Sequence, residues 1–333
     1  MSVKKPIISY IATGGTIAMR RTDASRGPVP SIGGQELLGQ VSGLSQAFSV
    51  EVEDFSNSPS VNLKPENWIA LHRHITSILA RQEVAGMIIS HGTDTLEETA
   101  FFLDLTLNSP KPVVLFGAQR SACDAQSDGP SNLLDALRVA QSKDARNRGV
   151  MVVMNHQIAA AWDVSKTHTT ALDSFQCGER GFLGTISADN TDQLLFHHAP
   201  KARQSIPLLS ERLCRVDIIP AYAGADDLMI TAAIAAGAKG LVIQALGAGN
   251  VNTALYNAIV NAISAGITPV IASRVPRGSV VPIYGYPGGG QTLVNAGAIF
   301  ANNLSPQKAR ILLMLLQQSG IPKDQWTDWF AER

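Results

Sequence analysis

Two strand-like segments of this chain end in the same kind of turn, and this repetition constrains the fold more than any other feature. The apolar run 7–12 leads into Thr13-Gly14-Gly15-Thr16, and the apolar run 87–90 leads into His91-Gly92-Thr93-Asp94. Glycines end a strand and allow the backbone to approach a ligand closely. Because strand C-termini border the ligand crevice of an open α/β sheet, the two turns are expected to bring hydroxyls and a carboxylate into one site.

Strand-like and helix-like segments alternate along the first half of the chain. Apolar runs typical of buried parallel strands occur at 7–12, 87–90, 112–116 and 150–154. Helical patterns lie between them, and the clearest begins at Pro65, with an apolar face of Trp68, Leu71, Ile75, Ile78 and Leu79. This alternation predicts a parallel, right-handed, doubly wound sheet.

A second, smaller series of strands and helices begins near residue 216. The stretch before it is rich in Pro, Lys, Arg and Ser and has weak periodicity, as is typical of a linker. The expected fold class is therefore α/β, with a larger N-terminal, doubly wound and mainly parallel sheet domain (1–195), a linker (196–215) and a smaller C-terminal α/β domain (216–333). Residues 19–34 are expected to form a mobile loop that acts as a lid.

The overall composition excludes several classes of function. Lys plus Arg and Asp plus Glu both number 27, so a formal net charge of zero gives no support for nucleic acid or a membrane surface as partner. The three cysteines, Cys123, Cys177 and Cys214, are odd in number and widely spaced. They form no disulfide framework pattern and no CxxC metal knuckle, which fits a reducing compartment. The first expected strand begins close to Met1, so no signal peptide is expected before it, and no apolar run is long enough to span a bilayer. A cytoplasmic protein is the simplest expectation.

Four residues of the two turns and of a later polar stretch have catalytic potential: Thr16, Thr93, Asp94 and Lys166. A threonine hydroxyl is a weak nucleophile that needs a neighbouring base. A partly buried lysine loses charge and serves as such a base, and a carboxylate accepts hydrogen bonds from a substrate ammonium. His91 beside the site is a candidate proton carrier.

Simpler structural roles are also compatible with these residues. Thr16 can cap a helix, Thr95 and Glu98 have the spacing of a capping box, and an isolated lysine is usually a solvated surface residue. His91 can hold its turn in place. The glycine turns lack the spacing of dinucleotide and P-loop motifs, the histidines lack the spacing of a helical metal pair, and no serine-hydrolase motif is present.

Several motifs, in order along nearly the whole chain, resemble the bacterial L-asparaginase / glutaminase-asparaginase family. They are Thr13-Gly14-Gly15-Thr16-Ile17-Ala18, His91-Gly92-Thr93-Asp94-Thr95-Leu96-Glu97-Glu98-Thr99-Ala100, Asn147-Arg148-Gly149-Val150, Asp163-Val164-Ser165-Lys166-Thr167, Ser273-Arg274-Val275-Pro276 and Asn303-Leu304-Ser305-Pro306-Gln307-Lys308. The resemblance implies an amidohydrolase that releases ammonia from a side-chain amide such as that of L-asparagine, through a covalent acyl-threonine.

The resemblance also implies roles for the catalytic residues. Thr16 matches the nucleophile of the family. Thr93, Asp94 and Lys166 match a second catalytic group, in which the lysine polarises the Thr93 hydroxyl and the Thr93 backbone N–H helps to hold the oxyanion. No metal or organic cofactor is expected.

Substrate contacts follow from the resemblance in the same way, and the matching residues are Gly15, Ser60, Val61, Gly92, Ala118 and Asn250. Ser60 matches the residue that binds the α-carboxylate, Asp94 the residue that takes the α-amino group, and Ala118 the residue whose carbonyl meets the leaving amide. Family members are homotetramers, built as dimers of dimers. The small domain of one subunit closes the site of its neighbour, and Asn250 matches a residue contributed that way.

Three departures from the family pattern are expected to matter. Residues 19–34 contain no tyrosine where the family lid usually carries one. Either another group activates Thr16, with Tyr222, Tyr284 and Tyr286 as candidates, or the lid works differently. Val61 and Asn62 stand where the family has a polar residue and an acid. Tyr284-Gly285-Tyr286 occupies the region of a neighbour-supplied carboxylate.

The second and third changes remove partners of the substrate α-amino group, each worth about 1–3 kcal/mol. The expected specificity is therefore open between L-asparagine and a different small ω-amide. A catalytically weak amino-acid-binding relative is the alternative from another functional class. An amidotransferase, which passes its ammonia to a partner enzyme, would need an additional synthetase partner or an RNA-binding region, and the sequence gives no sign of a basic patch or extra domain for it.

Overall fold

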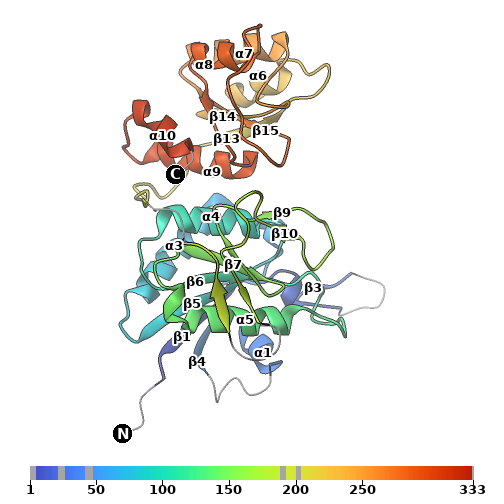
Figure 1. The fold of residues 1–333 in the computed structure, drawn as a ribbon, viewed down its shortest axis with the longest axis vertical. Helices are drawn as coiled ribbons and strands as arrows, with labels where there is room; N and C mark the ends of the chain where they lie inside the picture. Colours follow the sequence, from blue (N-terminus) through green and yellow to red (C-terminus); the bar gives the residue numbers. More distant parts are fainter. Residues whose placement is uncertain (1–4, 22–26, 42–47, 188–192, 200–203, 332–333) are drawn as a thin grey trace. The chain divides into compact units, whose positions relative to one another are not determined.

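The computed structural model describes residues 5–21, 27–41, 48–187, 193–199 and 204–331. The chain divides into two compact units, an N-terminal unit, Met1–Ser205, and a C-terminal unit, Ile206–Arg333 (Figure 1). Parts of the expected lid, linker and N-terminus, at 22–26, 200–203 and 1–4, lie outside the described residues. Within the described residues, no helix combines the length and apolar character that crossing a membrane requires.

The N-terminal unit is built on an eight-stranded sheet in the order β12-β11-β8-β7-β6-β5-β1-β4. Its strands are β1 (Ile7–Ala12), β4 (Ser49–Asp54), β5 (Val84–Ser90), β6 (Val113–Phe116), β7 (Val150–Met154), β8 (Gln157–Ala160), β11 (Gly184–Ile186) and β12 (Leu194–Phe196). Strands β4, β1, β5, β6 and β7 are parallel, whereas β8, β11 and β12 extend the sheet in antiparallel pairs. The predicted α/β class with a mainly parallel sheet is confirmed.

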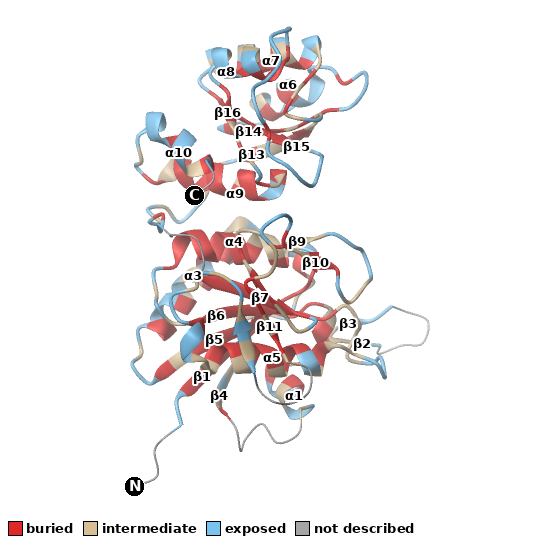
Figure 2. Cartoon of the chain, viewed as in Figure 1, coloured by how far each residue is buried: buried red, intermediate tan, exposed pale blue. Residues whose placement is uncertain are grey.

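Helices cover both faces of this sheet (Figure 1). Helices α3 (Pro65–Leu79) and α4 (Leu96–Thr106) lie on one face, and α1 (Gly34–Gly39) and α5 (Gly129–Gln141) lie on the other. The predicted apolar face of α3 is buried, and its Trp68 ring stacks on Phe102 of α4. The central strands β1, β6 and β7 are buried at every residue (Figure 2), because helices exclude water from both faces.

Antiparallel strands follow β7, in a region whose sequence shows little periodicity. Asn155 and His156 both have positive φ, +50° and +59°, and form the tight turn from β7 to β8. The chain then forms β9 (Ser165–Lys166) and β10 (Phe175–Gln176), a separate two-stranded antiparallel sheet. The described ends of the expected lid also pair, as β2 (Met19–Arg20) and β3 (Val29–Pro30).

The C-terminal unit contains a parallel sheet in the order β13-β14-β15-β16. Its elements are β13 (Val216–Pro220), α6 (Leu228–Ala235), β14 (Gly240–Ala245), α7 (Thr253–Ser264), β15 (Thr268–Ser273), α8 (Gly290–Ala296), β16 (Ile299–Phe300), α9 (Pro306–Gln318) and α10 (Trp326–Phe330). Helix α9 begins directly after Ser305, whose side chain caps it by accepting a hydrogen bond from the Lys308 N–H.

Candidate active site

The two glycine turns touch each other through their backbones. Strands β1 and β5 are neighbours in register, with Ala12 opposite Ser90, so their C-termini end side by side. A Cβ atom placed on Gly15 would lie 2.3 Å from the Cα of Gly92, a distance that no side chain can occupy. Gly15 also has a φ of +88°, which disfavours other residues. The turns that carry Thr16 and Thr93 are therefore brought together, as the strand pattern predicts.

Lys166 joins the second turn from a distant part of the sequence. Its Nζ donates hydrogen bonds to Thr93 Oγ1 at 2.9 Å and to Asp94 Oδ1 at 2.8 Å. The lysine side chain is 17% exposed and the Asp94 side chain 59% exposed, so the lysine lies inward of the carboxylate. Thr93 itself is buried. This lysine is not the solvated surface residue that is usual for an isolated lysine.

Thr16 is the first residue of a short 3₁₀-helix, η1 (Thr16–Ala18), and is half-buried. The capping position of η1 is occupied by Gly15, so the alternative role of Thr16 as a helix cap is wrong. The capping-box alternative at Thr95 is also wrong. Thr95 stands at the start of α4, but its hydroxyl donates to the Ser60 carbonyl at 2.9 Å and makes no cap bond.

That hydrogen bond ties a third segment to the two turns. Ser60 begins the 3₁₀-helix η2 (Ser60–Asn62) and is buried, whereas Val61 is exposed. A Cβ atom on Gly92 would lie 2.7 Å from Ser60 Oγ, so the absence of a side chain at Gly92 leaves room for this hydroxyl. Gly15, Ser60 and Gly92 thus lie in one cluster with Thr93.

The turn after β6 lies against the same cluster. A Cβ atom on Gly117 would lie 2.6 Å from the His91 carbonyl oxygen and 3.1 Å from Thr93 Cγ2. Ala118 follows directly and is fully buried. Three neighbouring strands, β1, β5 and β6, therefore each contribute one turn to this end of the sheet.

His91 is held in a fixed, neutral state beneath the site. Its Nδ1 donates to the Gly92 carbonyl at 2.8 Å, so in the neutral ring Nε2 accepts, from the Thr99 hydroxyl at 2.9 Å. Thr99 Oγ1 in turn accepts a hydrogen bond from Trp68 Nε1. Burial lowers the pKa of His91 to about 4. With both ring nitrogens engaged and no exposed surface, the imidazole supports the turn and is not a mobile proton carrier.

Two further residues contribute to the site, although the sequence patterns assign neither of them a role there. Glu97, in the first turn of α4, accepts a hydrogen bond from the Lys166 backbone N–H at 2.5 Å and so anchors β9 to the site. Tyr10 donates to the Ser90 hydroxyl at 3.1 Å between β1 and β5, and burial raises its pKa. The alternation pattern assigns Tyr10 to the core, and only the structure reveals its polar partner.

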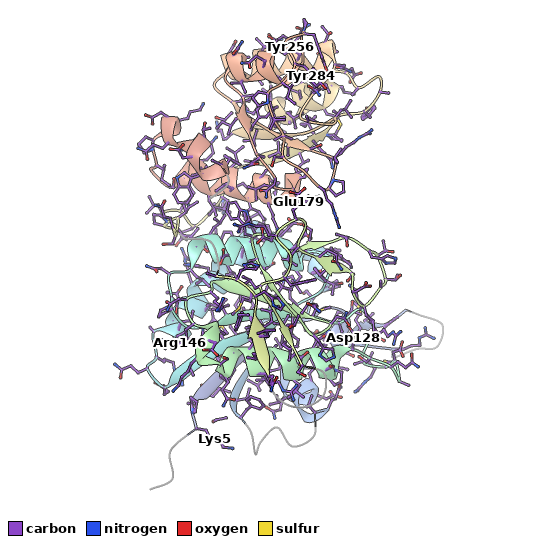
Figure 3. The ribbon with its side chains drawn as sticks, viewed as in Figure 1. Lys5, Asp128, Arg146, Glu179, Tyr256 and Tyr284 are labelled. Carbon is purple, nitrogen blue, oxygen red and sulfur yellow. The ribbon has the colours of Figure 1, made fainter. Side chains whose placement is uncertain are left out.

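The remaining predicted residues belong to the C-terminal unit. Asn250 follows β14, and its Oδ1 accepts from the Gly290 N–H at 3.3 Å. The three candidate tyrosines are all exposed there. Tyr284 is labelled in Figure 3, and its ring centroid lies 5.8 Å from that of Tyr286. Asn250 and the three tyrosines belong to the C-terminal unit, whereas the turns that carry Thr16 and Thr93 belong to the N-terminal unit.

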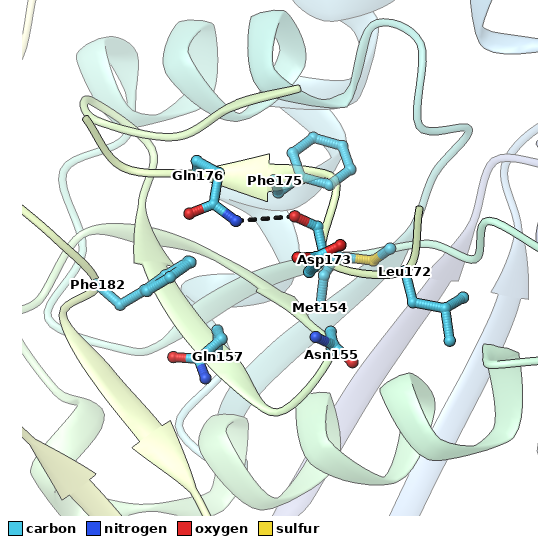
Figure 4. A pocket seen from close by; sticks show the side chains of 8 residues that line it. All are labelled: Met154, Asn155, Gln157, Leu172, Asp173, Phe175, Gln176 and Phe182. Carbon is cyan, nitrogen blue, oxygen red and sulfur yellow. Dashed lines mark hydrogen bonds between the residues drawn. The ribbon is translucent and has the colours of Figure 1, made fainter. Parts of the chain in front are cut away.

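A small cavity of about 160 Å³ lies in the N-terminal unit (Figure 4). It is lined by Met154, Asn155, Gln157, Leu172, Asp173, Phe175, Gln176 and Phe182, and includes none of the predicted site residues. Across the described ranges, no group of three or more His, Cys, Asp or Glu side chains is arranged to hold a metal ion.

The chain matches known proteins over nearly its full length. Residues 7–201 match the family described as Asparaginase, N-terminal, and residues 215–330 match the Glutaminase/Asparaginase C-terminal domain. It is 37% identical to L-asparaginase 2 of Bacillus subtilis, over 93% of this chain and 82% of that protein. It is 40% identical to a probable L-asparaginase of Deinococcus radiodurans, over 97% of both. Its fold is similar to that of a probable cytoplasmic L-asparaginase from Campylobacter jejuni, with a TM-score of 0.87, 32% identity and coverage of 99% and 100%.

Proposed function

The chain belongs to the asparaginase family, and we propose that it is an amidohydrolase that converts L-asparagine to L-aspartate and ammonia through an acyl-threonine intermediate. The observation that carries the proposal is the contact of Lys166 Nζ with both Thr93 Oγ1 and Asp94 Oδ1. A binding protein has no need of a lysine directed at a buried hydroxyl, so this geometry favours catalysis over simple binding. Named L-asparaginases among the relatives support the substrate, and none supports a different ω-amide.

In the first half of the proposed reaction, the Thr16 hydroxyl attacks the side-chain amide carbon. A C–O bond forms, the C–N bond breaks, and the hydroxyl proton passes to the departing nitrogen, which leaves as ammonia. The backbone N–H of Thr93 helps to stabilise the oxyanion of the tetrahedral intermediate. Gly15 and Gly92 support this arrangement, because their direct contact places the two turns within reach of one substrate.

In the second half, water hydrolyses the acyl-threonine ester. Thr93 takes a proton from the attacking water as its own hydroxyl proton passes to the uncharged Lys166 amine, the ester C–O bond breaks, and this proton returns through Thr93 to the Thr16 oxygen. Asp94 holds the substrate α-amino group and Ser60 its α-carboxylate. The exposed carboxylate of Asp94 and the buried hydroxyl of Ser60 suit those two charges.

We further propose that the protein acts as a homotetramer, a dimer of dimers, and is cytoplasmic. In this assembly the C-terminal domain (216–333), after a linker at 196–215, closes a neighbour's catalytic domain (1–195) and supplies Asn250. Large exposed apolar side chains on the C-terminal unit support an interface there, among them Leu228, Met229, Ile283, Tyr284 and Tyr286. The similarity to a probable cytoplasmic L-asparaginase from Campylobacter jejuni supports the cellular location.

Ammonia release from L-asparagine, L-glutamine, D-asparagine and succinamic acid tests the function. We expect L-asparagine to be hydrolysed with the highest kcat/KM, because its α-amino and α-carboxylate groups both have partners in the proposed site. Succinamic acid lacks the α-amino group, and its preference over L-asparagine would show that the changes at Val61 and Gly285 have altered the substrate. Absence of ammonia from all four compounds would leave a binding protein as the remaining function.

A further inference from the structure

The turn after β6 is held by two side chains from the start of α5. Asp128 is labelled in Figure 3. Both of its carboxylate oxygens accept backbone hydrogen bonds, Oδ2 from the Gln119 N–H at 3.0 Å and Oδ1 from the Arg120 N–H at 2.9 Å. The buried Asn132 side chain donates to the Gly117 carbonyl and to Asp128 Oδ2, each at 3.0 Å. Residues 117–120 are thus fixed at both ends of the turn.

This use of Asp128 is unusual for its position. It is the N-cap residue of α5, where an aspartate normally accepts from the backbone N–H groups of its own helix. Here the side chain makes no cap hydrogen bond, and both oxygens serve the preceding turn. In place of a cap hydrogen bond, Asp128 makes two charge-assisted hydrogen bonds, to the backbone N–H groups of residues 119 and 120. These bonds indicate that the site requires a fixed orientation of this turn.

These bonds also determine the direction of the Ala118 carbonyl. The peptide unit between Ala118 and Gln119 is planar and trans, so its C=O points opposite to the N–H that faces Asp128. In the described part of the chain, this buried carbonyl oxygen accepts no hydrogen bond. A buried carbonyl usually has a partner, and its location next to Gly117, which contacts Thr93, makes the substrate the suitable one.

We propose that Asp128 is a positioning residue that directs the Ala118 carbonyl at the leaving nitrogen of the substrate and thereby selects amides over esters. The inference rests on the proposed function, in which that carbonyl accepts a hydrogen bond from the amide NH₂ group. An ester of the same acid has no hydrogen on its leaving oxygen and gains nothing from a directed carbonyl. The rest of the acyl-transfer machinery acts on both compounds alike.

The test compares the hydrolysis of L-asparagine and L-aspartate β-methyl ester, with L-aspartate formation as the common readout. In Asp128→Ala we expect kcat/KM for the amide to fall by about tenfold or more and that for the ester by less than about threefold. Asp128→Asn keeps one acceptor for the Gln119 N–H and should retain most of the amide preference. Circular dichroism and thermal melting establish that each variant is folded.

Asp124→Ala is the matched control, because Asp124 lies in the same loop and also accepts a backbone N–H, that of Gln126 at 2.9 Å. We expect it to leave the amide-to-ester ratio unchanged. If Asp128→Ala leaves the amide-to-ester ratio of kcat/KM unchanged, either because both values fall equally or because neither falls, the positioning role would be overturned while the proposed function stands. An unaltered chain inactive on both compounds would overturn the function and, with it, this inference.

Discussion

The turns after β1 and β5 have the same sequence layout but different surroundings. The Thr93 hydroxyl is buried, receives a hydrogen bond from Lys166, and belongs to a turn fixed from below by His91. The Thr16 hydroxyl is half-buried, and among the described residues no side chain bonds to it. A repeated motif has thus produced one hydroxyl that is organised in advance and one that is open to react. This difference fits a proposed division between an assisting threonine and a nucleophilic threonine.

The largest effects are expected from removing either hydroxyl. Thr16→Ala and Thr93→Ala should each lower kcat for L-asparagine by at least about 10³-fold, because nucleophile and assisting group act as a unit. Only Thr16→Ala should also abolish the acyl-enzyme, measured by mass spectrometry of the acid-quenched protein. Near-normal turnover in Thr16→Ala would show that Thr16 is not the nucleophile and would remove the proposed distinction between the two turns. Unfolding curves like those of the unaltered chain would show that both variants are folded.

A smaller effect is expected from the lysine that distinguishes the two turns. Lys166→Met keeps much of the side-chain length but removes the Nζ contacts to Thr93 and Asp94, and should lower kcat by about 10²–10⁴-fold. KM should change less than kcat, since in the proposed site the lysine affects the bound substrate only through Thr93 and Asp94 and does not contact it directly. Lys111→Met is a suitable control, because this lysine also donates two hydrogen bonds, to backbone carbonyls away from the site. If Lys111→Met were as inactive as Lys166→Met, the assignment of Lys166 as the residue that assists Thr93 would be contradicted.

The smallest effect is expected from His91, which supports the Thr93 turn, and it concerns the pH dependence of the free energy of unfolding. His91 has a pKa of about 4 in the folded protein and about 6.5 when unfolded. As the pH falls, the unfolded chain therefore binds a proton at His91 before the folded chain does. The contribution of the neutral ring to the free energy of unfolding is complete above pH 6.5 and is lost as the pH falls toward 4, by roughly 3 kcal/mol in total.

Urea unfolding of the unaltered chain and of His91→Asn at pH 7 and pH 5 measures this contribution. The asparagine does not titrate, and its NH₂ group can replace the Nδ1 donor. We expect the variant to be less stable at pH 7 by about 1–2 kcal/mol, with a smaller difference at pH 5. A difference that grows as the pH falls would show that His91 is not buried as a neutral ring.

The parallel part of the fold and the meeting of the two turns were predictable, because both follow from local patterns. Apolar runs that alternate with helices can pack only as a covered parallel sheet, and adjacent parallel strands end at the same edge. The apolar spacing of α3 likewise determined which face is buried. Strands β8, β11 and β12 were not predicted, since they are short and partly exposed and lack a clear period.

The supporting side chains of the site were beyond prediction for a different reason. Asp128 and Thr95 both stand at helix starts, where local rules assign them to their own helices, yet both bond to other segments. Glu97 anchors a residue 69 positions away. Such choices depend on which backbone groups the tertiary fold leaves without partners, and a local pattern holds no information about them.

The position of Lys166 on β9 determines how late during translation the proposed catalytic residues of this domain can all be present. Thr93 and Lys166 are 73 residues apart. A ribosome that adds about 5–20 residues per second delivers the lysine roughly 4–15 s after the threonine. During that interval the emerging chain already carries both hydroxyls but not the lysine proposed to assist Thr93. Under the proposed mechanism, a nascent chain that stops before β9 would therefore have strongly reduced amidase activity, however well its first strands have paired.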